Sequence, residues 1–196
     1  MRITLPGIKQ FTFLVALGVG SASALAKVPP PAQIDLEGGR LVQQKENRLF
    51  TVDAGKHKIL PIQVPTALSR ALKKSSSIGF PADHSRLIDG KEYILIVVNQ
   101  SSSTNPSGYC GAGEEGTLYA LELHGSSAVP RFALQVQSCL KDLELASDSN
   151  QKSEYLAISW KEAPVGIQVR WDVYGDKSDV SRFYKYQGGQ FIEATQ

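Results

Sequence analysis

The segment Tyr93-Ile94-Leu95-Ile96-Val97-Val98 decides the fold. Its residues are all apolar and mostly β-branched, which suits a strand. A strand with one face in water alternates apolar and polar residues, whereas an unbroken apolar run is typical of a strand buried on both faces. We therefore expect this segment to be the central strand of a sheet.

Other strand-like segments lie on both sides of this run. In residues 165–173 five apolar residues alternate with polar residues and a glycine, which predicts a half-buried strand. Gly188-Gly189 predicts a two-residue hairpin turn. Pro61 predicts that the strand at residues 58–64 lies at the edge of its sheet. The remaining segments with strand character are 48–52, 58–64, 117–123, 131–137 and 156–160.

Residues 65–74 contain the one helix that the sequence predicts. Ala67, Leu68, Ala71 and Leu72 recur at helical spacing, and Pro65 suits a first turn. With one helix among many strands, the expected class is mostly β. The architecture would be an antiparallel β-sandwich, or a sheet rolled against one short helix, with one disulfide.

Residues 1–26 have the pattern of a secretory signal peptide. Arg2 and Lys9 supply its positive charge, an apolar segment follows, and Ala24-Leu25-Ala26 matches the small-x-small cleavage pattern. We expect an exported chain that begins at Lys27 and lies in the periplasm or is secreted. Residues 27–33 are proline-rich and predict an extended leader, and residues 27–196 are expected to form a single β-rich domain.

The mature chain is expected to be electrically neutral. The full sequence has 21 basic and 19 acidic residues, and two of the basic ones belong to the signal peptide. Nucleic acid and anionic lipid both select a basic surface, so the charge argues against either as a partner. No later apolar run reaches the ~20 residues of a spanning helix, so we expect no membrane insertion after cleavage.

Cys110 and Cys139 are the only cysteines. An even number of cysteines in an exported chain predicts one disulfide between them. Closing a loop of about 30 residues contributes about 3–4 kcal/mol in the chain-entropy view. The alternative is a free, nucleophilic thiol at Cys110.

Cys110 lies in a glycine-rich stretch, residues 107–116, with the sequence Ser-Gly-Tyr-Cys-Gly-Ala-Gly-Glu-Glu-Gly. Glycine at this density indicates a sharply turning backbone or a close approach. The stretch contains G-x-G-x-x-G, but a phosphate loop of that type leads into a helix. Here a strand follows and two carboxylates would repel phosphate, so we expect no nucleotide and no other cofactor.

No metal or catalytic constellation emerges from the sequence. His57, His84 and His124 lack the spacing of metal ligands. Asp83-His84-Ser85 is not expected to act as a triad, because triad members come from separate elements. A glycosidase would need a second carboxylate besides Glu114 or Glu115, and the candidates are Glu122, Asp142 and Glu144.

The aromatic residues divide into core and surface candidates. Trp160 and Trp171 fall on the apolar side of their strands, which favours core packing over a sugar platform. Tyr109 lies instead in a polar, glycine-rich loop, where the pattern does not require it for the core. A rigidly held aromatic residue in such a loop is typical of a binding contact.

One block carries a resemblance. Gly108-Tyr109-Cys110-Gly111-Ala112-Gly113 is followed by an acid, an apolar strand and, further on, Ser138-Cys139. This arrangement resembles a group of uncharacterised exported bacterial proteins and covers roughly a quarter of the chain. The resemblance implies export and a disulfide, and it brings no assigned activity.

Together these features predict an exported, non-enzymatic binding module, of the inhibitor or immunity type, with another cell-envelope protein as its partner. Tyr109 is the expected contact, and Glu114 or Glu115 the charge that attracts a basic partner. One alternative is an exported hydrolase that acts on cell-wall or glycan material through carboxylates. The other is a structural accessory of an envelope complex.

Overall fold

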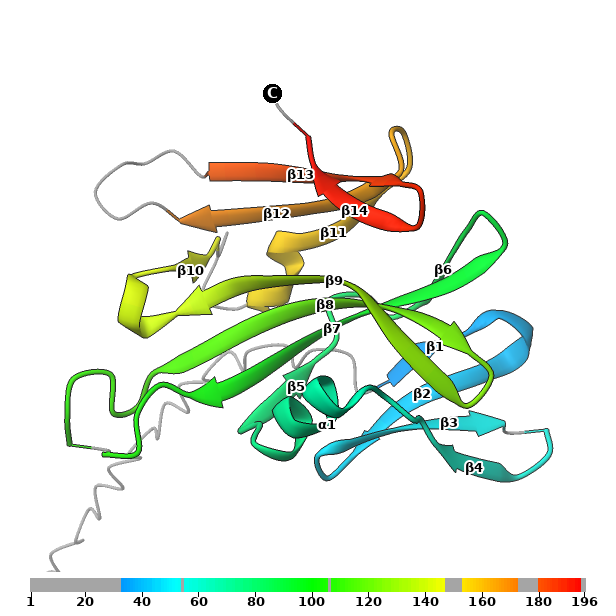
Figure 1. Cartoon of the computed structure of the whole chain (residues 1–196), viewed down its shortest axis with the longest axis horizontal. Coiled ribbons are helices and arrows are strands. Elements are labelled where there is room, and N and C mark those ends of the chain that lie inside the picture. The colour runs from blue at the N-terminus through cyan, green and yellow to red at the C-terminus, as the bar shows by residue number, and fades with distance from the viewer. Residues whose placement is uncertain (1–32, 54, 106, 147–152, 173–179, 195–196) are drawn as a thin grey trace, which may run out of the picture.

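A computed structural model of the chain describes residues 33–53, 55–105, 107–146, 153–172 and 180–194 (Figure 1). These residues form three antiparallel sheets and one α-helix, and they include the disulfide, so the predicted mostly-β class is confirmed. The predicted signal peptide, and the proline-rich leader up to residue 32, lie outside the described residues.

The first sheet is a meander in which each strand pairs with its sequence neighbour. Pro61 lies in the last strand, at the edge of the sheet, where its missing N–H breaks no ladder. The elements are β1 (Gln33–Asp35), the 3-10 turn η1 (Glu37–Gly39), β2 (Arg40–Lys45), β3 (Arg48–Asp53) and β4 (Lys58–Pro61).

The predicted helix is present as α1 (Thr66–Lys73). Leu68 and Leu72 lie one turn apart and are buried, while Arg70 and Lys73 lie in the last turn, where cations interact favourably with the helix dipole. Within the described ranges, no helix is long and apolar enough to cross a membrane.

The second sheet lies at the centre and has the order β5-β7-β8-β9, with β6 also paired to β7. The predicted strands 117–123 and 131–137 fall inside β8 and β9, but β8 begins three residues earlier than expected. The strands are β5 (Ser77–Gly79), β6 (Arg86–Ile88), β7 (Lys91–Ser101), β8 (Glu114–His124) and β9 (Ser127–Ser138).

The third sheet is formed by the C-terminal part of the chain in the order β10-β12-β13-β14, with β11 paired to β12. The predicted Gly188-Gly189 turn joins its last two strands. After β9 the 3-10 turn η2 (Cys139–Lys141) leads into β10 (Glu144–Leu145), and η3 (Glu154–Ala157) precedes β11. The other strands are β11 (Ile158–Lys161), β12 (Gly166–Asp172), β13 (Val180–Gln187) and β14 (Gln190–Glu193).

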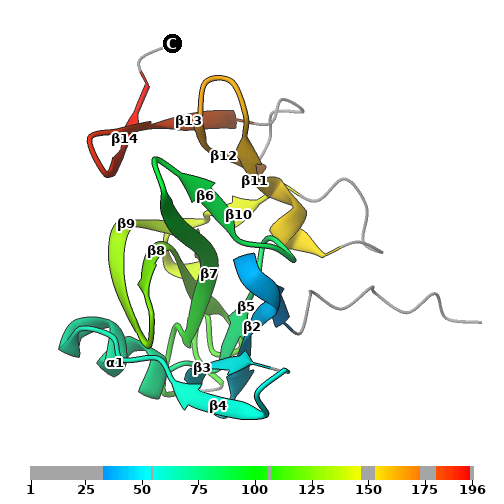
Figure 2. The same cartoon turned by 90° about the vertical axis from the view of Figure 1, so that its right-hand side faces the viewer.

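Strand β7 explains why three sheets pack as layers (Figures 1 and 2). Tyr93, Leu95 and Val97 point into a core shared with the third sheet. Their neighbours Ile94, Ile96 and Val98 point to the other side, into a core shared with the first sheet and α1. Because side chains alternate along a strand, the unbroken apolar run supplies both cores at once.

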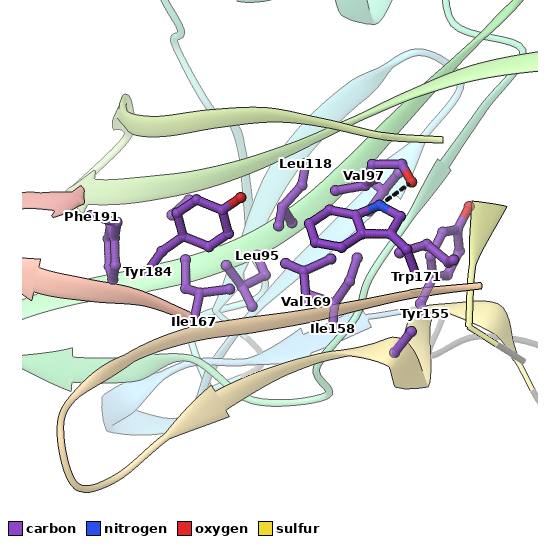
Figure 3. Packing of buried hydrophobic residues seen from close by; sticks show 14 of the residues in the cluster. Leu95, Val97, Leu118, Tyr155, Ile158, Ile167, Val169, Trp171, Tyr184 and Phe191 are labelled. Carbon is purple, nitrogen blue, oxygen red and sulfur yellow. Dashed lines mark hydrogen bonds between the residues drawn. The ribbon is translucent and has the colours of Figure 1, made fainter. Parts of the chain in front are cut away.

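Trp171 fastens the third sheet to the central one (Figure 3). Its side chain is buried, and its indole Nε1 donates a hydrogen bond of 2.9 Å to the carbonyl oxygen of Val136 in β9. The period-two run of β12 therefore faces the core, as expected. Tyr184 and Phe191 of the adjacent strands line the same layer.

Candidate functional site

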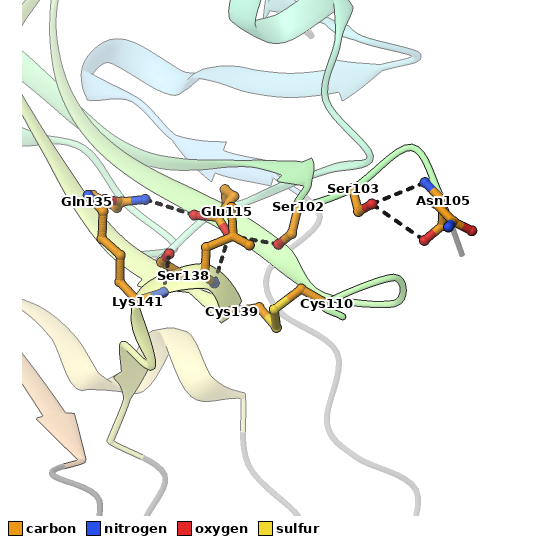
Figure 4. Close-up of a disulfide and its surroundings, with 10 residues drawn as sticks. Ser102, Ser103, Asn105, Cys110, Glu115, Gln135, Ser138, Cys139 and Lys141 are labelled. Atoms are coloured by element: carbon orange, nitrogen blue, oxygen red, sulfur yellow. Dashed lines mark hydrogen bonds between the residues drawn. A yellow bond between two sulfur atoms is a disulfide. The ribbon is translucent and has the colours of Figure 1, made fainter. Parts of the chain in front are cut away.

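The predicted bridge between Cys110 and Cys139 is present, with the two Cα atoms 5.8 Å apart (Figure 4). It ties residues 107–113, here called the disulfide loop, to η2 at the end of β9. Since disulfides persist in oxidising compartments, the bridge indicates an extracytoplasmic environment.

The backbone of the disulfide loop is held by a succession of short hydrogen-bonded turns. Gly111 N donates to Gly108 O at 2.9 Å, Gly113 N to Cys110 O at 3.0 Å, and Ser102 N to Gly113 O at 2.9 Å. Cys110 itself has a left-handed φ of 55°, which is uncommon for a residue other than glycine. The disulfide and the surrounding turns together fix this conformation.

Gly113 serves a close approach. A Cβ atom added there would lie 2.5 Å from Cys139 Cβ and 2.7 Å from its Sγ, well inside van der Waals contact. The loop can therefore pass directly against the bridge because this position lacks a side chain. The glycine-rich sequence indicated either a sharp turn or a close approach, and Gly113 allows a close approach.

Glu115 belongs to β8 and points inward, against the disulfide loop (Figure 4). Its carboxylate accepts hydrogen bonds from Ser102 Oγ at 2.7 Å, Gln135 Nε2 at 2.9 Å and Leu140 N at 3.3 Å. Three segments of the chain thus meet on one side chain, so Glu115 holds the base of the loop in place.

Burial is the largest single influence on the Glu115 carboxyl and raises its pKa. The hydroxyls of Ser138 and Ser102, the Leu140 amide and the charge of Lys141 oppose it and together hold the pKa of Glu115 below its usual range. The carboxylate is therefore ionised at neutral pH, although its negative charge is satisfied within the protein.

Glu114 points to the opposite side of β8, as expected for adjacent residues in a strand. Its Oε1 accepts a hydrogen bond of 2.8 Å from Ser76 Oγ at an exposed position. Of the two predicted acidic contacts, Glu114 is thus the one whose carboxylate accepts fewer hydrogen bonds from the protein.

Tyr109 is 75% exposed, the most exposed of the large apolar side chains in the described chain. Leu140, which directly follows Cys139, is 54% exposed. An apolar side chain therefore stands next to each of the two bridged cysteines. Leu140 was not among the residues predicted to bind. Its only local signal is an aliphatic residue directly after a cysteine, at the point where the strand alternation ends.

Glu122, a candidate second carboxylate for a hydrolase, is only 1% exposed. Arg131 Nε lies 2.7 Å from its Oε2, and His124 Nε2 and Lys91 Nζ lie 2.9 Å and 3.5 Å from its Oε1. Tyr93 Oη lies 3.3 Å from Oε2. Burial raises the pKa of Glu122, but the hydrogen bond and charge of Arg131, with Lys91 and His124 nearby, hold it below the usual range.

The remaining sequence candidates are dispersed. Asp83 Oδ1 and His84 Nδ1 contact each other at 2.5 Å on the surface, whereas the Ser85 hydroxyl donates to Glu92, so the three do not converge. Within the described residues, no three His, Cys, Asp or Glu side chains gather as a metal site requires. Trp160 is half-buried against Phe191.

No protein-family model, curated protein or solved structure matches the chain. The resemblance to exported bacterial proteins stays a prediction. Function is therefore inferred from the geometry of the disulfide loop and its surroundings.

Proposed function

We propose that this chain is an exported, non-enzymatic binding module of the inhibitor or immunity type. Its protein-binding surface would consist of Tyr109 in the disulfide loop, Leu140 in η2 and Glu114 at the start of β8. The observation that carries the proposal is the 75% exposure of Tyr109 beside a residue that the disulfide locks. A ring held in water by a fixed backbone loses little conformational freedom on binding and gains a large buried area.

Leu140 supports the same surface. Isolated exposed apolar residues are ordinary on soluble proteins. Here Tyr109 directly precedes Cys110, and Leu140 directly follows Cys139. The covalent link between the two cysteines therefore keeps both exposed residues on the same part of the surface. A partner with an apolar hollow would bury both side chains.

The charge of the surface comes from Glu114 in this proposal. Glu115 has another role, because its carboxylate is taken up by Ser102, Gln135 and the Leu140 amide. An exposed carboxylate at the rim of an apolar contact speeds association with a basic protein more than it strengthens the complex. We therefore propose a partner whose apolar hollow is bordered by Lys or Arg.

The proposed location is the periplasm or the extracellular medium. The disulfide supports an oxidising compartment. The signal-peptide pattern in residues 1–26 adds the route, with Lys27 as the expected first residue of the mature protein.

The two rival functions have less support from the geometry. A hydrolase acting through Glu115 or Glu122 would need a carboxylate free to meet substrate, and both are engaged by side chains of the protein itself. Asp142, another candidate carboxylate, lies elsewhere and lines a cleft together with Asp172. A structural accessory of an envelope complex would use its surface for permanent assembly. That function predicts co-purification at fixed stoichiometry instead of reversible binding.

The experiment is affinity capture from an envelope extract, followed by titration of the captured protein against variants. Tyr109→Ala should weaken binding by about 2 kcal/mol or more, as truncation of hot-spot aromatics does. Leu140→Ala should weaken it less, and Glu114→Gln should slow association and reduce its dependence on salt.

The matched control is Ile59→Ala, since Ile59 is 65% exposed in β4 of the first sheet. It should leave the affinity unchanged. If Tyr109→Ala binds as tightly as Ile59→Ala while both variants stay folded, the binding surface lies elsewhere and the proposal is wrong.

A further inference from the structure

A cleft of about 410 Å³ opens between the edge strand β9 and the third sheet. Its volume falls within the range of small-molecule sites, about 300–1,000 Å³. Leu134, Leu143, Trp171 and Val180 form apolar walls. The cleft is therefore large enough, and apolar enough, to hold the body of a small organic molecule.

Tyr184 lines this cleft and carries an unsatisfied polar group. Its side chain is only 4% exposed and points from β13 toward the central sheet (Figure 3). Within the described residues its hydroxyl makes no hydrogen bond of ordinary geometry, although Arg182 lies close enough to act on it. The ring is fixed against Phe132, with ring centroids 4.8 Å apart. Buried hydroxyls are normally hydrogen-bonded, so this one points to a partner from outside the chain.

The charges that line the cleft favour a cation. Arg182 is already engaged, because its Nη1 lies 3.4 Å from Glu193 Oε1 and its guanidinium lies 5.9 Å from the Trp171 ring centre. Asp142 and Asp172 line the same cleft and carry no side-chain hydrogen bond or ion pair in the part of the chain that the structure describes. Among the described side chains that line the cleft, the charges left unpaired are therefore the two negative ones.

We propose that this cleft binds a small organic cation with an apolar, planar body. The body lies among Leu134, Leu143 and Trp171, a polar group on the body meets the Tyr184 hydroxyl, and the ammonium group meets Asp142 and Asp172. None of these side chains belongs to the protein-binding surface proposed above, and the cleft proposal does not rest on it.

The test uses three probes with the same 4-hydroxyphenyl skeleton and different charge: tyramine, the neutral alcohol tyrosol, and 3-(4-hydroxyphenyl)propanoate. Each is titrated into the ¹⁵N-labelled full mature protein while the indole N–H signals are followed by NMR. The chain has two tryptophans, and Trp171 lines the cleft, so its indole signal reports binding while that of Trp160 serves as the internal reference.

Tyramine should shift the Trp171 signal with a dissociation constant about threefold or more below that of tyrosol, because exposed ion pairs contribute modestly. The propanoate should bind most weakly. Tyr184→Phe should weaken tyramine binding, since the variant keeps the ring and removes the hydroxyl. Circular dichroism confirms that the variant is folded.

Asp142→Asn should also weaken tyramine binding, by about threefold. Asp89→Asn is the matched control, since Asp89 and Asp142 are both exposed and both have φ of 50°, a conformation that asparagine tolerates. The proposal is overturned if tyramine at about 10 mM leaves Trp171 unshifted. The proposal is also overturned if the propanoate binds as tightly as tyramine. It is overturned as well if the Asp142→Asn and Asp89→Asn variants bind tyramine with equal affinity.

Discussion

Replacing Arg131 by methionine should destabilise the protein by about 2 kcal/mol at neutral pH. Arg131 Nε donates a hydrogen bond of 2.7 Å to Glu122, which is 1% exposed. Hydrogen bonds to charged groups contribute about 1.5–3 kcal/mol, and breaking a buried ion pair costs about 3–5 kcal/mol. Lys91 and His124 still face the carboxylate after the substitution, so we expect the lower part of this range.

The pH dependence distinguishes a charge effect from a packing effect. Because the folded-state pKa of Glu122 is lowered, its contribution to stability is present above the unfolded-state pKa of about 4.3 and is lost as the pH falls through the folded-state pKa. Without Arg131 that pKa rises. As the pH falls, the carboxyl is therefore protonated in the folded variant before it is protonated in the folded wild type, so the difference in unfolding free energy should be smaller at about pH 3 than at pH 7.

The assay is urea unfolding of wild type, Arg131→Met, Glu122→Gln and the double variant at both pH values. In the double variant no buried charge remains, so the effect of Arg131→Met should fall by at least about 1 kcal/mol. Arg48→Met, at an exposed position of β3, is the control and should change the free energy by less than about 0.5 kcal/mol. Equal effects of Arg131→Met at pH 7 and pH 3, with additivity in the double variant, would refute a buried-charge role for Glu122.

Two further predictions concern the disulfide loop. The double variant Cys110→Ser, Cys139→Ser should lose about 3–4 kcal/mol of unfolding free energy in urea, since the bridge closes a loop with a sequence separation of 29; a loss below about 1 kcal/mol would contradict the chain-entropy account. Gly113→Ala should destabilise by about 1–3 kcal/mol, because its Cβ would lie 2.5 Å from Cys139 Cβ. Gly108→Ala, whose nearest new contact would be 3.4 Å, is the comparison, and equal melting temperatures would show that the close approach is unimportant.

Elements with a strong local pattern were predictable from the sequence. The apolar run of β7, the alternation in β12, the Gly188-Gly189 turn and the helical spacing in α1 each carry their signal within a few residues. Strand β2 carries no such local signal, because Val42 is its only fully buried residue and polar neighbours hide the alternation. The short strands β5 and β6 exist through their pairing with β7, which local sequence cannot reveal.

The candidate site was predictable only in part. The bridge followed from the cysteine count and the compartment, and the opposite directions of Glu114 and Glu115 followed from strand geometry. The role of Glu115 did not, because its three donors come from residues 102, 135 and 140, which only the tertiary fold brings together. The cleft between the sheets was not predictable for the same reason, since its walls come from β9 and from segments that follow it in the sequence.

The double-sided strand β7 has a consequence for the order in which the chain folds. The chain emerges from its N-terminus, so the first and central sheets, up to Ser138, can form before the third sheet, which begins at Glu144. In that interval Tyr93, Leu95 and Val97 present an apolar sheet face to water. Such faces promote aggregation, so a chain truncated after β9 should precipitate or need a chaperone. The third sheet therefore covers the apolar face of the central sheet, which the earlier part of the chain would otherwise expose to water.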